Sequence, residues 1–452
     1  MKRAVTEDRP HPPRPDLRRF RRELTPTWIA AALVCDGQGL PRWDRPTVVY
    51  LDGSSRLGGF TAPVVAACQP DAQVLAWSPF PSALSAASDL SRDLDRAAGL
   101  DNLVVHESAE PPMPTEPIAD LVIVDGILDS VDDEYRSRLL DSVKALLRPG
   151  GVACVRYRTT VGWSELAPVL RLVRHVVSLD PRDPLDALPD ALDLVVELRA
   201  GGAAYLTQRP AVTAWLDELV AMPTADAVAA YLDLDLRPLS QAQLRSAMGS
   251  IGCEYVGSAQ VGDALGIDQP EGTRELTASL PAAVLRESFE DLATRRSHRT
   301  DLFQLGPTSP SESEHKRDLA SLTVLGLPQP SSDHDGAPTS MGPSAEHIPK
   351  SVRKALSEGA VTLADLEPDP SARAGLLRRL MAAGLAHPVA AGDDGGADPR
   401  KDARRAVARL NKVLGRAPVP ERDRLIASQI IGSAVAASPR PTKSDLARMG
   451  VR

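Results

Sequence analysis

The sequence predicts a doubly wound, Rossmann-like α/β sheet in its first half, followed by a mostly helical region and a helical C-terminal module. Between residues 46 and 175, short apolar runs rich in β-branched residues alternate with helical patterns. A glycine-containing turn follows the first run, and beyond residue 185 the apolar spacing is largely helical. At 452 residues, with 43% hydrophobic and 25% charged residues, the chain is expected to form several globular domains.

Cysteine usage and hydropathy exclude several protein classes. The four cysteines are too far apart in sequence for a C-x-x-C pair, so we expect neither a metal site nor a disulfide framework. No run of 18 apolar residues is present, and the first 25 residues lack the apolar segment of a signal peptide. We therefore expect a cytoplasmic protein with no membrane partner.

The first half opens with a predicted helix and continues as alternating strands and helices. The helix covers Thr25–Val34, with Thr25 as its N-cap and Pro26 in its first turn. The predicted strands are Thr47–Leu51, Gln73–Trp77, Leu103–His106, Ala119–Val124 and Val152–Tyr157. The predicted helices between them are Ala62–Ala67, Ser82–Ala98 and Asp133–Leu147. This alternation favours a parallel sheet.

The second half reads as helices around one polar stretch. Helices are predicted near 185–199, 211–221, 225–231, 240–250, 281–296, 350–358, 371–383 and 400–414. Residues 306–348 are rich in Pro, Ser, Asp and Gly and are predicted as a linker, in which Leu322–Leu327 could form a strand. The predicted organisation is a disordered segment 1–24, an α/β domain 25–180, a helical domain 181–305, the linker 306–348 and a C-terminal module 349–452.

Candidate ligand-binding residues follow the predicted strands. In an open α/β sheet, ligands bind outside the carboxyl ends of the strands. The turn after the first strand supplies Asp52, Gly53 and Gly58, although it has no G-x-G and could be an ordinary βα turn. The second strand ends in Trp77-Ser78, without the carboxylate that usually holds a ribose. Asp125 follows the fourth strand, where it is either a site residue or a capping aspartate.

Four stretches, in order along the chain, resemble bacterial protein lysine methyltransferases that carry a methyltransferase regulatory domain. The most specific is LRPGGVACVRYRTTVGW at Leu147–Trp163, which is similar to L-x-P-G-G-V-A-Y-V-S-Y-N-T-x-P-G-W. The others are Val124–Leu140, Tyr231–Gly257 and Arg286–Phe303. The resemblance implies a class I methyltransferase domain over 25–180, a regulatory domain over 181–305, S-adenosylmethionine as cofactor and a protein lysine as substrate.

The resemblance also assigns the candidate residues. It implies a cofactor pocket formed by Asp52, Gly53, Gly58, Ser78 and Asp125. It implies Asp125, Tyr157 and Trp163 on the acceptor side, because aromatic faces and oxygen acceptors hold an amine and its developing charge.

The chain departs from the family pattern at several of these positions. The family's L-G-C-G falls on Leu51–Ser54 and loses its first glycine, and D-L-S-P falls on Ala76–Pro79 and loses its acid. H-G-V-Y-S-W-V-P falls on Asp125–Asp132, and Arg158 stands at the asparagine of Y-N-T. These departures keep open a second interpretation, a catalytically impaired methyltransferase-like protein that binds or regulates a partner protein.

A third interpretation, a DNA-binding regulator, depends on the C-terminal charge. Residues 400–452 hold 13 basic and 4 acidic side chains, whereas the whole chain has a net charge of −8. The order helix, turn, helix, strand after Pro349 is compatible with a winged helix, with Arg373, Arg378 and Arg379 on its second helix. The alternative is a basic face packed on the preceding domain, so we expect a protein partner rather than nucleic acid.

Overall fold

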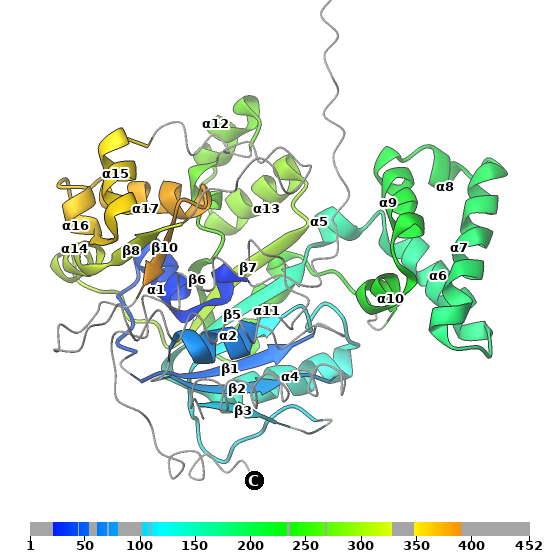
Figure 1. Ribbon diagram of the computed structural model, residues 1–452, viewed down its shortest axis with the longest axis horizontal. Coiled ribbons are helices and arrows are strands. Elements are labelled where there is room, and N and C mark those ends of the chain that lie inside the picture. The colour runs from blue at the N-terminus through cyan, green and yellow to red at the C-terminus, as the bar shows by residue number, and fades with distance from the viewer. Residues whose placement is uncertain are drawn as a thin grey trace, which may run out of the picture.

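A seven-stranded sheet organises the protein (Figure 1). The computed structural model describes residues 21–43, 45–53, 61–69, 72–79, 102–106, 108, 110–232, 236–266, 269–327 and 348–389. The strands are β1 (Thr47–Asp52), β2 (Gln73–Trp77), β3 (Leu103–Val105), β4 (Ala119–Asp125), β5 (Leu147–Arg158), β6 (Cys253–Ser258) and β7 (His298–Leu305). Their spatial order is β3-β2-β1-β4-β5-β7-β6.

Strands β1 to β5 are parallel, which confirms the predicted doubly wound sheet. Strand β7 is antiparallel to both β5 and β6. The sequence did not predict β6 and β7, which lie in the segment 181–305 that reads as helical. Strand β7 carries Arg299 and Asp301 in its buried stretch, so its composition lacks the apolar run that marked the other strands. Pairing with β5 and β6 makes it a strand nevertheless.

Helices cover the sheet on both faces. Tyr50, Ile123 and Cys154 belong to one buried cluster, which includes residues of α1 (Pro26–Cys35) and α2 (Thr61–Cys68). The neighbouring residues of the same strands point the other way, into a second cluster with α4 (Asp133–Leu146) and α11 (Gln241–Ser250). The predicted helix at Ser82–Ala98 lies outside the described residues.

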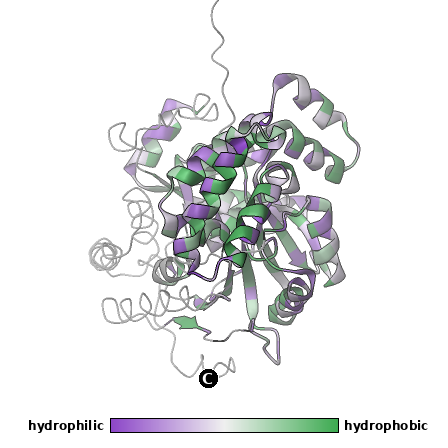
Figure 2. Cartoon of the chain, turned by 90° about the vertical axis from the view of Figure 1, so that its right-hand side faces the viewer, coloured by the Kyte–Doolittle hydropathy of each residue, from purple (hydrophilic) through white to green (hydrophobic). Residues whose placement is uncertain are grey.

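A helical lobe extends to one side of the sheet (Figure 1). After the short α5 (Thr160–Trp163), it contains α6 (Ala167–Leu179), α7 (Pro184–Ala200), α8 (Ala204–Thr207), α9 (Pro210–Ala221), α10 (Thr224–Ala227) and the π-helical turn η2 (Val228–Leu232). The lobe has its own core, in which Trp215 packs edge-on against Tyr231. Figure 2 shows that polar and apolar residues alternate around its helices, as expected for amphipathic elements around a core.

Two helices, α12 (Glu271–Ser279) and α13 (Ala283–Thr294), follow β6 and the turn η3 (Asp263–Leu265) and lead into β7. The C-terminal module then begins with α14 (Glu312–Ser321). It continues as β8 (Thr323–Gly326), α15 (Lys350–Glu358), β9 (Ala360–Thr362), α16 (Leu363–Leu366), α17 (Arg373–Ala382) and β10 (Ala386–Val389). Its three strands form an antiparallel sheet in the order β10-β8-β9.

Helix α14 lies within residues 306–348, which the sequence predicts as a linker, so the first part of that segment is corrected, whereas residues 328–347 lie outside the described residues. The Ser311 side chain accepts a hydrogen bond from the backbone N–H of Glu314, and the Glu314 carboxylate accepts one from the backbone N–H of Ser311. This capping box was readable as S-x-x-E, but the surrounding polar composition concealed it. The possible strand at Leu322–Leu327 is present as β8 (Thr323–Gly326). The predicted helix at 400–414 lies outside the described residues.

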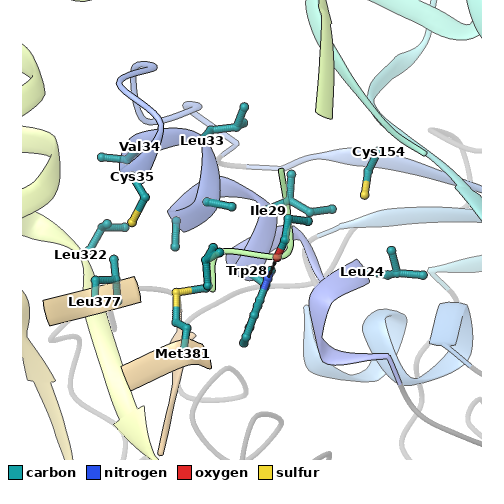
Figure 3. Close-up of a cluster of buried hydrophobic side chains, with 14 of the residues drawn as sticks. Leu24, Trp28, Ile29, Leu33, Val34, Cys35, Cys154, Leu322, Leu377 and Met381 are labelled. Carbon is teal, nitrogen blue, oxygen red and sulfur yellow. Dashed lines mark hydrogen bonds between the residues drawn. The ribbon is translucent and has the colours of Figure 1, made fainter. Parts of the chain in front are cut away.

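The C-terminal module packs on α1 (Figure 3). Leu377 and Met381 of α17 face Ile29 and Cys35 across an apolar interface. Arg378 donates hydrogen bonds to the Cys35 carbonyl, at 2.5 Å, and to the Asp36 carboxylate, at 2.6 Å. Arg378 is therefore part of an internal interface, so this geometry favours the packed basic face over a recognition helix for DNA.

A buried histidine makes this packing sensitive to acid. His387 of β10 is fully buried against Thr25 and Trp28, and burial lowers its pKa to about 4. The positive charge of the Arg22 guanidinium contributes to this lower pKa in the same direction as burial. As the pH falls, His387 takes up a proton near pH 6.5 in the unfolded chain but only near pH 4 in the folded protein. The free energy of unfolding is therefore unaffected by this group above pH 6.5 and decreases as the pH falls from 6.5 toward 4.

We therefore expect acid to destabilise the protein through His387. Between pH 6.5 and pH 4 this group should remove about 3 kcal/mol of unfolding free energy, at 1.36 kcal/mol for each pKa unit. Urea unfolding over this pH range should show that His387→Gln lowers the pH dependence. Equal pH slopes for the variant and the natural protein would contradict the role of His387.

Candidate functional site

Three of the predicted cofactor residues meet at the carboxyl ends of adjacent strands. Asp52 at the end of β1 is in register with Asp125 at the end of β4. Leu51 pairs with Trp77, so Ser78 follows at the end of β2 beside them. All three polar residues are buried. The structure thus gathers Asp52, Ser78 and Asp125 where an open α/β sheet binds ligands, whereas Gly58 lies outside the described residues.

Gly53 allows the ends of β1 and β4 to approach each other closely. Its backbone N–H donates a 2.8 Å hydrogen bond to the Asp125 carbonyl. A Cβ atom at Gly53 would lie 2.7 Å from the Gly126 carbonyl oxygen and 2.8 Å from the Ile127 Cα. No side chain fits against that backbone, so the glycine is required for the shape of the site.

Two arginines hold the Asp125 carboxylate. Arg21 Nε lies 3.0 Å from Oδ2, and Arg156 Nη1 lies 3.2 Å from Oδ1. Burial alone would raise the pKa of Asp125, but Arg21, Arg156 and the nearby Arg158 outweigh burial and keep that pKa below its ordinary value. Asp125 therefore remains ionised and is a poor proton acceptor, although it can still accept hydrogen bonds.

A second ion pair lies one step further along β5. Arg158 Nη1 contacts Asp129 Oδ2 at 2.9 Å and donates to Ser130 Oγ at 3.1 Å. The Asp129 side chain is completely buried, and the Arg158 side chain is 18% exposed. The Arg158 guanidinium also lies 5.5 Å from the ring centre of Trp163, within cation–π range. Arg156 and Arg158 alternate with Tyr157, so both face the side of the sheet that holds Asp125.

The two predicted aromatic residues occupy other positions. Tyr157 points to the opposite face of the sheet, where its hydroxyl donates a 2.8 Å hydrogen bond to Asp301. Trp163 packs in the core of the helical lobe, and its Nε1 donates to the Ser297 carbonyl at 3.0 Å. Its ring is edge-on to His298 at 5.8 Å. The structure does not bring Tyr157 to Asp125, and Trp163 adjoins the site through Arg158 and His298.

Sequence reasoning missed five residues of this site, namely Arg21, Asp129, Arg156, Arg158 and His298. Burial and the positive charges of Arg156, Arg158 and Arg21 lower the pKa of His298 well below its ordinary range. Arginine at alternate positions of a buried strand, in Val155–Arg158, was a usable signal because a buried charge requires a partner. Arg21 and His298 gave no such signal, since each comes from a segment far away in the sequence.

The described residues contain neither a metal-binding cluster nor a membrane-spanning helix. Within those ranges, no three His, Cys, Asp or Glu side chains are grouped so that they could hold a metal ion. No helix among the same residues is both long enough and apolar enough to cross a membrane.

The comparison with protein families identifies one segment. Residues 230–304 match the family model described as a predicted methyltransferase regulatory domain. This match begins in the helical lobe, at η2, and ends in β7. It therefore includes β6 and β7, the two strands that complete the sheet.

Similar proteins cover most of the chain. An uncharacterized protein of Synechocystis sp., sll1526, is 21% identical over 73% of this chain and 67% of its own length. The structure of PKMT2 from Rickettsia typhi is 14% identical, covers 85% of this chain and 79% of its own, and has a TM-score of 0.56. The same protein in complex with AdoHcy is 16% identical, covers 83% and 77% of the two chains, and has a TM-score of 0.56. The chain thus shares its Rossmann-like fold with PKMT2, and its residues 230–304 match the model of a predicted methyltransferase regulatory domain.

Proposed function

We propose that the protein is an S-adenosylmethionine-dependent methyltransferase that methylates a protein side-chain amine, that of lysine. The observation that carries the proposal is the group of buried polar residues at the carboxyl ends of β1, β2 and β4, in a sheet of methyltransferase strand order. The regulatory domain and the fold shared with PKMT2 support it. The choice of lysine depends on the sequence resemblance.

The residues at these strand ends fit a polar cofactor. Asp52, Gly53, Ser78 and Asp125 are the residues that would hold it, and Gly58 in the same turn is a further candidate. Gly53 keeps the strand ends close, and the two carboxylates offer acceptors for hydroxyl and ammonium groups. When bound, S-adenosylmethionine supplies a methyl group that is already activated for transfer.

The protein's own contribution is positioning. Methyl transfer to an amine requires the nitrogen to be aligned with the methyl group, which is an orientation problem more than a proton-transfer problem. Asp125, held ionised by two arginines, can orient an amine by accepting its hydrogen bond. Trp163 offers an aromatic face near Arg158, whereas Tyr157 acts at a distance by holding Asp301.

A second function, a methyltransferase-like protein that binds a partner without catalysis, has its own support. Strand β2 ends in Trp77-Ser78 without a carboxylate, and both oxygens of Asp125 are engaged by arginines. Each lost hydrogen bond to a charged group costs about 1.5–3 kcal/mol. Two such losses would move a micromolar site toward the millimolar range.

Calorimetric titration with S-adenosylmethionine and S-adenosylhomocysteine separates the two functions. Under the enzyme hypothesis we expect a dissociation constant of about micromolar size. Asp52→Asn should weaken binding about ten- to a hundred-fold, because a charged hydrogen bond becomes a neutral one. Asp120→Asn is the matched control: Asp120 lies near the opposite end of β4, where it accepts from the Thr47 N–H, and its loss should leave binding unchanged.

The outcomes are distinct. No heat at millimolar ligand would overturn the enzyme hypothesis and favour the binding protein. If the ligand binds, incubation with methyl-labelled S-adenosylmethionine and a bacterial protein extract, followed by acid hydrolysis, should release labelled methyl-lysine. Label on another amino acid would contradict lysine as the acceptor.

A further inference from the structure

The turn that carries Arg21 lies outside the sheet. It is formed by Arg21 and the short 3-10 helix η1 (Arg22–Leu24), which leads directly into α1. The Leu24 N–H donates to the Arg21 carbonyl at 3.0 Å, and the Tyr50 hydroxyl of β1 donates to the Leu24 carbonyl at 2.9 Å. Leu24 is fully buried (Figure 3). The backbone of the turn is therefore fixed on the sheet at one side.

The other side of the turn is held by the C-terminal module. His387 Nε2 lies 3.3 Å from Thr25 Oγ1, while its Nδ1 lies 2.6 Å from the Pro388 carbonyl. The Pro388 carbonyl can only accept, so Nδ1 carries the proton. Nε2 contacts the Thr25 hydroxyl, which itself donates a 2.7 Å hydrogen bond to the Arg22 carbonyl, so the ring packs against a hydroxyl that is bonded to the turn. Thr25 lies four residues from Arg21. The module therefore contacts the turn more than 350 residues away in the sequence.

A second contact strengthens this link. The Arg22 guanidinium lies 5.3 Å from the ring centre of Trp28 and next to Gly384, where an added Cβ would come within 3.0 Å of Arg22 Nη1. Gly384 has a φ of +66°, so a side chain there would also strain the backbone. The turn between α17 and β10 thus leaves room for Arg22, the residue that follows Arg21.

The two arginines on Asp125 differ in what fixes them. Arg156 belongs to β5, which pairs with β4, so the sheet itself places it beside Asp125. Arg21 comes from outside the sheet, and ordering a long arginine side chain costs conformational entropy that must be offset by contacts that hold its backbone. Those contacts include the ones made by the module through Thr25 and Arg22.

We propose that the C-terminal module helps to form the candidate cofactor site: His387 is a positioning residue that holds the Arg21–Thr25 turn, so that Arg21 fixes the carboxylate of Asp125. This inference depends on the proposed function for the part that Asp125 plays in ligand binding. The coupling of His387 to Arg21 does not depend on it and is measurable without ligand.

The ligand-free test is a double-mutant cycle on the full chain. His387→Ala and Arg21→Ala each lower the urea midpoint, and the midpoint of the double variant should fall by less than the sum of the two shifts, because both remove the same arrangement. Leu363→Ala is the matched control: Leu363 is a buried residue of α16 in the same module, and its shift should add to that of Arg21→Ala. Additive shifts for His387 and Arg21 would overturn the coupling.

The second test measures S-adenosylhomocysteine affinity in the same variants. Arg21→Ala and His387→Ala should each weaken binding about ten- to a hundred-fold, and the double variant no more than Arg21→Ala alone. His387→Gln, which keeps a side-chain acceptor, should recover most of the affinity. Unchanged affinity in His387→Ala would overturn the link to the site. If the natural protein binds no ligand, the proposed function fails, and the ligand-free cycle alone decides the coupling.

Discussion

Replacing Asp129 by Ser, or Arg158 by Asn, should lower the free energy of unfolding by about 3–5 kcal/mol in each case, because each change leaves one buried charge without its partner. The pair is close, at 2.9 Å, and the Asp129 side chain is completely buried. The double variant removes both charges, so its loss should be smaller than the sum of the single losses. Urea unfolding of the four proteins measures the coupling directly.

An exposed ion pair provides the control for this cycle. Arg182 and Asp180 are in contact at 2.6 Å, with side chains that are 48% and 24% exposed. Asp180→Ser and Arg182→Asn should shift the urea midpoint little, since exposed pairs contribute little to stability. Losses for Asp129 and Arg158 that simply add would show that the two side chains are stabilised by other groups, and the prediction would be wrong.

The Asp129–Arg158 cycle bears on how the site departs from the sequence pattern that the chain resembles. Asp129 and Arg158 stand where that pattern has serine and asparagine, and Asp125 and Arg156 stand where it has histidine and serine. In the structure these four residues form two ion pairs with one another. Each acidic departure, at the end of β4 or in the loop that follows it, is therefore matched by a basic departure on β5. Independent losses of function at single positions would not produce such matched charges.

The sheet could be predicted from sequence to the extent that each strand is apolar. Strands β1, β2 and β4 cross the protein interior with both faces covered, and they read as short apolar runs. Strand β7 is equally buried, but it carries Arg299 and Asp301, which are satisfied by each other and by α13. Such internal pairing is a tertiary property, so residue type alone does not indicate it.

The residues of the site could be predicted from sequence where the geometry of the parallel strands determines their positions. Asp52, Ser78 and Asp125 follow strands whose carboxyl ends share one edge, so their proximity follows from the parallel order. The same geometry argued against Tyr157, because it alternates with Arg156 and must face the opposite side. Arg21 reaches Asp125 from outside the sheet, and no local pattern predicts that contact.

The second large effect concerns Arg299 of strand β7, which lies among three carboxylates. Its guanidinium contacts Asp301 at 3.0 Å, Asp291 at 2.8 Å and also Glu287, and its side chain is 2% exposed. Burial opposes the charge on Arg299, but the carboxylates outweigh it and raise its pKa. Burial raises the pKa of Glu287 to about 7 even with the arginine in place.

Arg299→Met should therefore destabilise the protein by about 3–5 kcal/mol near pH 8, because the carboxylates lose the charge that offsets their burial. Without Arg299 the folded-state pKa values of Glu287 and Asp291, which burial already raises, rise further above their unfolded values, so the folded variant takes up protons and gains stability as the pH falls. The difference from the natural protein in urea unfolding should thus be smaller at pH 5 than at pH 8.

Arg245→Met is the matched control for Arg299→Met. Arg245 contacts Glu287 at 3.3 Å and is 24% exposed, so its replacement should lower the free energy of unfolding by less. An Arg299→Met loss that is independent of pH, or no larger than that of Arg245→Met, would show that the carboxylates do not depend on this arginine.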